Sequence, residues 1–212
     1  MSGCCDNQSF DGTSPAYRRA LWAVIAINAV MFFVEMSAGV LSGSQALKAD
    51  ALDFAGDTAT YTLSLLVIGA SLKTRAIASL VKGGSLALIA LAVLTMTILR
   101  VMDGTPPEAA TMGLIGFIAL LANAASVVIL LRWRDGDSNV RSVWLCSRND
   151  AIGNVGVIFA AGLVTLTGTA WPDLIVAFLL AGLFLKSAAS ITFQAVGELK
   201  HTDHARNAPQ ET

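Results

Sequence analysis

The sequence predicts an all-α polytopic membrane protein with six transmembrane helices and both termini in the cytoplasm. Of its 212 residues, 55 % are hydrophobic and only 14 % are charged, whereas an average soluble domain carries roughly 25 % charged residues. Apolar runs of about 18 residues or more recur along the chain, and each is long enough to cross a hydrocarbon core of about 30 Å. This composition excludes a soluble globule, a disordered chain and a nucleic-acid-binding protein, which would need a clustered basic surface.

Three spans are predicted in the first half of the chain. Span one, residues 20–42, is an apolar run with Glu35 in its second half. Span two, residues 46–71, carries three aspartates before a clean apolar stretch. Span three, residues 81–101, is apolar between a lysine and an arginine. Each run has the length of a membrane-crossing helix.

Three further spans are predicted in the second half. Span four, residues 110–132, is apolar along almost its whole length, whereas span five, residues 141–167, contains a cysteine, an arginine and an aspartate. Span six, residues 172–195, is interrupted by Lys186. Short connections rich in turn-forming residues separate the spans, so sequence neighbours are predicted to run antiparallel.

The distribution of positive charge predicts the orientation. Lysine and arginine precede span one and gather in the second and fourth connections, and such residues stay on the cytoplasmic side. The chain then divides into a cytoplasmic tail (1–17), a transmembrane domain (18–197) and a second cytoplasmic tail (198–212). The first tail has no apolar segment of the kind found in a cleavable signal peptide. The cations that set this orientation are Arg18, Arg19, Lys73, Arg75, Lys82, Arg132, Arg134 and Arg141.

Ionisable residues inside the predicted spans are the strongest functional signal. Each costs about 2.5–3.5 kcal/mol at the centre of a membrane helix, so its presence suggests a function. The acidic ones gather on spans two and five. Seven lie away from the ends of the spans: Glu35, Asp50, Asp53, Asp57, Arg148, Asp150 and Lys186.

Two pairs of potential metal ligands share the same spacing. Asp53 and Asp57 are four residues apart, as are Cys146 and Asp150, so each pair projects from one helix face with its members about 6 Å apart. With a rise of about 1.5 Å per residue on antiparallel helices, the pairs meet near the membrane midplane, where transporter sites lie. Three carboxylates and a thiolate suit tetrahedral zinc or a similar divalent ion, and the sulfur favours softer metals. The expected neighbours of this ligand set are Glu35, Asp50 and Asn154.

Simpler interpretations of the same residues remain open. The acids can form structural ion pairs with Arg148, Lys186 or Lys48, and Cys146 can be a small packing residue. The acidic cluster can also serve a conductor of protons or monovalent cations that makes no use of Cys146.

Both tails also carry metal-ligating side chains. Cys4 and Cys5 could capture a soft metal on the reducing cytoplasmic side, or they could be incidental thiols. His201 and His204 are more simply explained as part of a solvated tail. The sequence has no phosphate-binding glycine loop and no Ser/His/Asp set, so neither an ATP-driven pump nor an enzyme is indicated, and no cofactor is expected.

Two stretches carry a resemblance to a known family. Gly43–Asp57 contains an Ala-Asp-Ala step followed by two aspartates four residues apart, and Asn139–Gly156 contains Cys146 and Asp150. They resemble the second and fifth helices of the cation diffusion facilitator family of metal efflux transporters. The resemblance extends over about residues 15–196 and is closest to truncated members that lack a cytoplasmic C-terminal domain.

The resemblance implies a secondary transporter of a bacterial-type inner membrane that exports a divalent metal ion in exchange for protons. Asp53 and Asp57 match the family's ligands on the second helix, and Asp150 matches the aspartate on the fifth. Cys146 stands where the family usually has His or Asp, so the expected cargo is Zn²⁺, with Cd²⁺, Co²⁺ or Hg²⁺ as alternatives. Expected partners are the lipid bilayer, the metal ion, protons and a second copy in a homodimer, but no nucleic acid. The alternative is a non-transporting membrane protein that binds metal or hands it to a partner.

Overall fold

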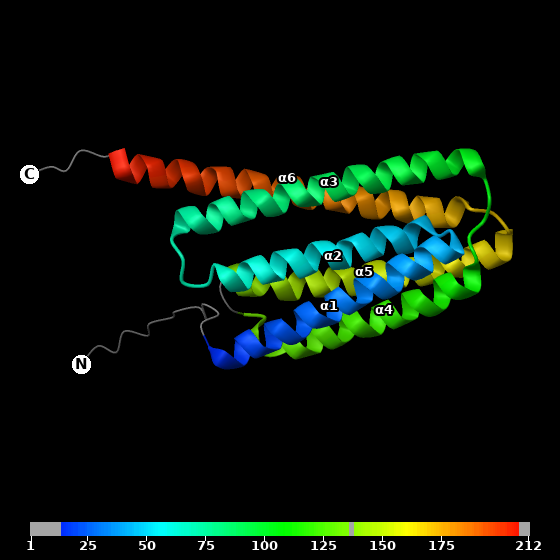
Figure 1. Ribbon diagram of the computed structural model, residues 1–212, viewed down its shortest axis with the longest axis horizontal. Coiled ribbons are helices and arrows are strands. Elements are labelled where there is room, and N and C mark those ends of the chain that lie inside the picture. The colour runs from blue at the N-terminus through cyan, green and yellow to red at the C-terminus, as the bar shows by residue number, and fades with distance from the viewer. Residues whose placement is uncertain (1–13, 136–137, 208–212) are drawn as a thin grey trace, which may run out of the picture.

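The computed structural model describes residues 14–135 and 138–207, and this part of the chain is helical almost throughout (Figure 1). A short 3₁₀ turn, η1 (Leu131–Trp133), follows the fourth long helix. No strand occurs among the described residues, so the all-α prediction is confirmed. The six long helices are α1 (Pro15–Ser42), α2 (Gln45–Leu66), α3 (Leu72–Asp103), α4 (Ala109–Leu130), α5 (Ser138–Thr167) and α6 (Trp171–Asn207).

Five of these helices, all except α2, are long and apolar enough to cross a membrane. Helix α2 is the exception because Lys48, Asp50, Asp53 and Asp57 lie within its 22 residues. Five of the predicted spans therefore coincide with helices that have the length and apolar composition to cross a membrane. At 1.5 Å of rise per residue α2 is about 33 Å long, and its role as the sixth span stays a prediction.

The connection between α2 and α3 differs from the prediction. Span two was predicted to continue to residue 71, but α2 ends at Leu66, and Gly69 has a φ of 79° that only glycine adopts easily. The expected connection around Lys73 is instead the first turn of α3, because the Ser71 hydroxyl caps that helix by accepting from the Thr74 N–H at 3.3 Å. Hydropathy locates the apolar part of a helix, and the cap determines where the helix begins.

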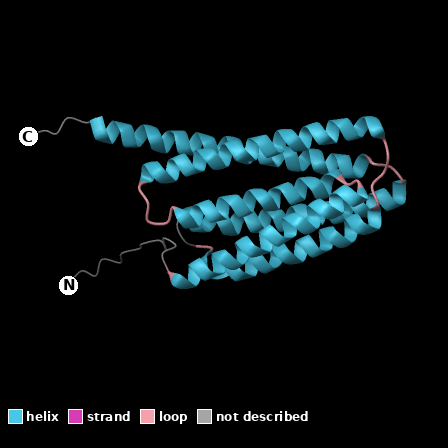
Figure 2. Cartoon of the chain, viewed as in Figure 1, coloured by secondary structure: helices cyan, strands magenta, loops and turns pink. Residues whose placement is uncertain are grey.

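The six helices are arranged as a group of four and a pair. Helices α1, α2, α4 and α5 pack together, while α3 and α6 make their most extensive contacts with each other alongside that group (Figure 1). Short loops join the helices at both ends of the bundle (Figure 2). The start of α1 and the end of α6 lie at the same end, as an even number of antiparallel helices requires.

The α3–α6 pair is closely packed at one glycine. A Cβ atom added at Gly83 of α3 would lie 2.5 Å from the Thr192 Oγ1 of α6. Small residues at such crossings let two membrane helices approach along their backbones. The pair therefore depends on the absence of a side chain at this position.

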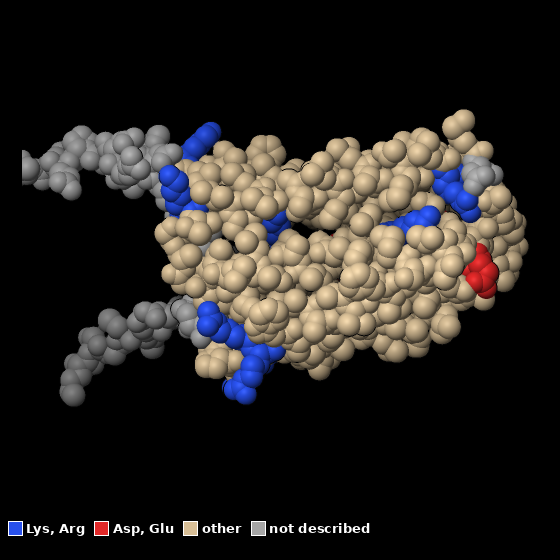
Figure 3. Space-filling model, viewed as in Figure 1, with Lys and Arg blue, Asp and Glu red and all other residues tan. Residues whose placement is uncertain are grey.

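Large apolar side chains cover the outside of the bundle. On the face drawn in Figure 3, Lys and Arg lie mainly toward the two ends, and the broad middle is almost entirely neutral. An apolar surface of this extent is unfavourable in water and natural in lipid. Exposed examples from five helices are Phe33, Leu88, Val128, Phe159 and Phe193.

Candidate metal centre

The acidic side chains of α2 and α5 meet inside the bundle. Asp53 and Asp57 project from α2, and the carboxyl group of Asp150 on α5 lies within hydrogen-bonding reach of both. All three side chains are only half-buried, so a water molecule or an ion can reach them. The two helices contact each other less extensively than α1 contacts α2 or α4 contacts α5. The structure thus brings these three residues together, as the spacing predicted.

Cys146 lies at the same site, one helical turn before Asp150. Its thiol is a free cysteine, half-buried, and close enough to Asp57 and Tyr61 to interact with both. Among the described residues, however, no three His, Cys, Asp or Glu side chains have their ligand atoms gathered around one point. The four predicted ligands are neighbours, and they would have to turn toward a common point to complete a coordination shell. Their assignment as ligands remains a prediction.

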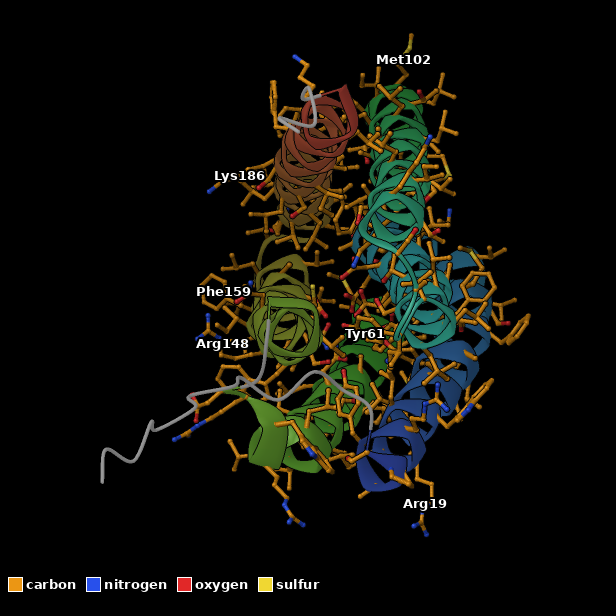
Figure 4. All side chains as sticks on the ribbon, turned by 90° about the vertical axis from the view of Figure 1, so that its left-hand side faces the viewer. Arg19, Tyr61, Met102, Arg148, Phe159 and Lys186 are labelled. Atoms are coloured by element: carbon orange, nitrogen blue, oxygen red, sulfur yellow. The ribbon has the colours of Figure 1, made fainter. Side chains whose placement is uncertain are left out.

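Tyr61 is a residue of this site that the sequence analysis did not identify. It is fully buried on α2 and lies inside the bundle (Figure 4). Its hydroxyl group donates to the Oδ2 atom of Asp57 and lies 3.4 Å from the carbonyl oxygen of Val143 on α5. Tyr61 therefore links α2 and α5 and orients one of the aspartates. Its position four residues after Asp57 was the one signal available in the sequence.

Lys82 is a residue whose place was predicted incorrectly. It was assigned to the connection between spans two and three, but it lies in the third turn of α3. From there its ammonium group is close enough to attract the Asp57 carboxylate and the Cys146 sulfur. The site thus contains one positive charge from a third helix.

The ion pairs considered as an alternative do not form with Arg148 or Lys186. Both side chains are exposed and point away from the bundle (Figure 4). The guanidinium of Arg148 donates to the Asn149 side chain at 3.2 Å and lies 5.4 Å from the Trp144 ring centroid. Lys48 lies close enough to Asp173 to be attracted by its carboxylate, and close enough to Arg100 to be repelled by its guanidinium. None of these three cations neutralises the aspartates that α2 and α5 share.

The residues expected beside the predicted ligands are buried, and several of their polar atoms have no hydrogen-bond partner among the described residues. Glu35 on α1 is fully buried and faces Asp50. Both Glu35 carboxyl oxygens and the Asp50 Oδ2 atom have no hydrogen-bond partner among the described residues, and neither amide atom of the buried Asn154 has one. Buried carboxylates in this situation need a proton or a cation between them. The interior around Asp53 therefore favours a positive ligand.

The metal-ligating residues of the two tails are only partly covered by the structure. Cys4 and Cys5 lie outside the described residues. His201 and His204 lie in the last turns of α6, which continues to Asn207 and so runs through much of the expected C-terminal tail.

Comparison with known proteins identifies the family. Residues 21–199 match the family described as the cation efflux transmembrane domain. The chain is 32 % identical over 195 residues to the zinc transporter ZitB of Escherichia coli (strain K12), which covers 86 % of this chain and 62 % of that protein. It is 27 % identical over 179 residues to the cadmium, cobalt and zinc/H(+)-K(+) antiporter of Bacillus subtilis (strain 168), covering 77 % of this chain and 57 % of that protein.

A third relative extends the comparison. The metal cation efflux system protein CzcD of Cupriavidus metallidurans is 24 % identical over 197 residues, which cover 84 % of this chain and 62 % of that protein. The chain therefore spans less than two thirds of the length of these relatives. With its five apolar helices it is a multi-pass membrane protein of the bacterial inner-membrane type. The chain belongs to the cation efflux family, also called the cation diffusion facilitator family.

Proposed function

We propose that the protein exports a divalent metal ion from the cytoplasm across a bacterial inner membrane in exchange for protons, as a secondary active transporter. The primary cargo is Zn²⁺, with Cd²⁺, Co²⁺ and Hg²⁺ as alternatives. One observation carries the proposal: the Asp150 carboxyl of α5 lies within hydrogen-bonding reach of Asp53 and Asp57 on α2. Such a cluster inside a bundle with an apolar surface is costly unless it binds a cation or protons.

The ligands are Asp53, Asp57, Cys146 and Asp150. Three carboxylates and one thiolate provide the four donors of a tetrahedral zinc site. The thiolate shifts the preference toward softer ions such as Cd²⁺ and Hg²⁺. Two of the relatives bear names that include zinc, and one of these also names cadmium and cobalt. These names support a divalent ion of this group as the cargo.

The same groups explain exchange for protons. Carboxyl and thiol groups must lose protons before they bind a metal ion, so metal and protons compete for one site. Facing the cytoplasm, the deprotonated site takes up the ion. Exposed on the other side, where protons are more abundant, it takes up protons and releases the ion. The packing of α3 with α6 and of the other four helices with one another supplies two units that can move relative to each other.

The proposal includes an arrangement in the membrane. Helix α2 is the sixth span, held in the bundle by its neighbours, and both termini lie in the cytoplasm. The excess of Lys and Arg before α1 and in the α2–α3 and α4–α5 connections supports this orientation. The family resemblance supports a homodimer as the working state.

Zinc flux in proteoliposomes tests the proposal. An imposed pH gradient should drive zinc transport by the wild type, and Asp57→Asn or Asp150→Asn should reduce the initial rate on the order of 100-fold, because each loses a ligand without changing shape. The matched control is Asp135→Asn, an exposed aspartate in the α4–α5 connection that pairs with Arg134 at 3.3 Å. Retained flux in either site variant rejects the site. Zinc binding without flux in the wild type would favour the non-transporting metal-binding alternative.

A further inference from the structure

Asp173, in the first turn of α6, holds the start of α2 although the two are far apart in the sequence. The side chain is only 1 % exposed. Its Oδ1 atom accepts from the Ser44 hydroxyl at 2.5 Å and from the Ala46 N–H at 3.0 Å, and its Oδ2 atom accepts from the Gln45 N–H at 2.8 Å. One carboxylate thus receives three hydrogen bonds from the N-terminal end of another helix.

These bonds complete the cap of α2. Within the helix, the Ser44 hydroxyl oxygen accepts from the Leu47 N–H at 3.0 Å. This serine cap leaves the N–H groups of Gln45 and Ala46 without an acceptor from their own helix, and Asp173 accepts from both. Negative charge at this position also interacts favourably with the helix dipole. The first turn of α2 is therefore fully satisfied only while α6 stays in contact with it.

The contact joins the two units of the bundle. Helix α6 packs mainly against α3, whereas α2 packs mainly against α1 in the group of four. Asp53 lies eight residues after Gln45, the first residue of α2, which is about 12 Å along the axis at 1.5 Å per residue. Because α2 moves as a rigid helix, any translation or rotation at its start also moves Asp53 and Asp57. Metal–ligand distances tolerate deviations of only about 0.2 Å, so even a small shift matters.

We propose that Asp173 is a positioning residue: it fixes the start of α2 against α6 and so sets the height and rotation at which Asp53 and Asp57 meet Asp150. The inference rests on the proposed metal centre between α2 and α5. Asp173 itself binds no metal ion. It acts through the three hydrogen bonds to Ser44, Gln45 and Ala46.

Zinc affinity of the purified protein, measured by titration calorimetry in lipid nanodiscs, is the first test. Asp173→Ala should raise the Kd for Zn²⁺ on the order of 10-fold, the loss typical when a ligand's support is removed. Asp173→Asn should have a smaller effect, because its amide oxygen still accepts. The control is Glu108→Ala at the start of α4, which lies at the same end of the bundle because the Glu108 N–H donates to the Ser42 carbonyl oxygen at 2.9 Å. It should leave the Kd unchanged.

The double variant Ser44→Ala/Asp173→Ala separates positioning from general stability. If both residues act through their shared hydrogen bond, the effects of the two single substitutions do not fully add, and the double variant is worse than Asp173→Ala only by the cap that Ser44 gives to the Leu47 N–H. A purely structural role would lower the yield and the Tm of Asp173→Ala while leaving the Kd of the folded fraction unchanged. That result, or additive effects of the two substitutions, overturns the inference.

Hydrogen exchange supplies a readout that needs no metal. In Asp173→Ala the backbone amides of α2 from Gln45 through Asp57 should exchange faster, whereas those of α1 should keep the wild-type rate. An unchanged rate across α2 overturns the inference. If Asp173→Ala shows this exchange pattern but the wild type neither binds nor transports zinc, the proposed function is contradicted and the role of Asp173 in placing α2 stands.

Discussion

Replacing Tyr61 with phenylalanine removes one hydroxyl group and leaves an aromatic ring of the same shape in the core. That hydroxyl makes two contacts: it donates to the Asp57 carboxylate, and it lies 3.4 Å from the Val143 carbonyl oxygen on α5. Tyr61 is fully buried, so water cannot easily take its place. In Tyr61→Phe the Asp57 carboxylate loses its donor and with it a preferred orientation.

The expected magnitude follows from the type of hydrogen bond. A hydrogen bond to a charged group contributes about 1.5–3 kcal/mol, and about 1.4 kcal/mol corresponds to a tenfold change in an equilibrium constant. Substitution of a residue that orients a metal ligand typically lowers affinity by about 10–100-fold. The two estimates agree. Tyr61→Phe should therefore raise the Kd for Zn²⁺ by about 10–100-fold.

Calorimetric titration of Zn²⁺ into the purified protein, together with flux in proteoliposomes, measures the effect. The matched control is Tyr17→Phe on α1, where the tyrosine is also fully buried and its ring packs edge-on against Trp133 with centroids 5.6 Å apart. Tyr17 lies outside the proposed metal centre, so its variant should bind zinc like the wild type. A Tyr61→Phe protein with wild-type affinity would refute the idea that Tyr61 orients Asp57. Equal losses of zinc affinity in Tyr61→Phe and Tyr17→Phe would refute the idea that the effect is specific to the contact with Asp57.

Three further predictions test the sulfur ligand, the helix packing and the outward-facing cations. Cys146→Ser should weaken cellular tolerance to Cd²⁺ and Hg²⁺ more than tolerance to Zn²⁺, because the hydroxyl is a harder donor; equal losses for all three ions would remove the argument from softness. Gly83→Val should lower stability by about 1–3 kcal/mol through overpacking and reduce the Tm, whereas Gly84→Val, with no atom within 4 Å of its added Cβ, should not; equal Tm values would contradict the close crossing. Arg148→Ala and Lys186→Ala should keep zinc flux within about twofold of the wild type, since both point outward; a large loss in either would restore the ion-pair interpretation.

The sequence was sufficient to predict what depends on local pattern. Apolar runs identified five helices long enough to span a membrane, and the repeated spacing of four residues identified the faces of α2 and α5 that meet. Side chains four residues apart share a helix face whatever the rest of the fold does. The placement of Asp150 within reach of Asp53 and Asp57 therefore required only that α2 and α5 be neighbours.

The residues that were missed depend on contacts across the fold. Asp173 was not identified, because its partner turn at Ser44 lies 129 residues earlier in the sequence. Lys82 was assigned to a connection because a positive charge next to an apolar run usually marks a membrane boundary. The capping hydroxyl of Ser71 instead starts α3 ten residues earlier than the predicted boundary near Lys82. Neither relation can be derived from the order of polar and apolar residues alone.

The distribution of polar contacts explains how α2 can occupy the middle of a membrane protein. Its four charged residues would together cost on the order of 10 kcal/mol on membrane-insertion scales, so lipid alone would not hold this helix. The other helices provide what lipid cannot: Asp173 of α6 caps the first turn, and the carboxyl groups of Glu35 on α1 and Asp150 on α5 can share a proton or a cation with the α2 aspartates that they face. The helix proposed to bind the ion is thus one whose position depends on its neighbours. A movement between the α3–α6 pair and the other four helices must therefore act on α2, and through it on the ion.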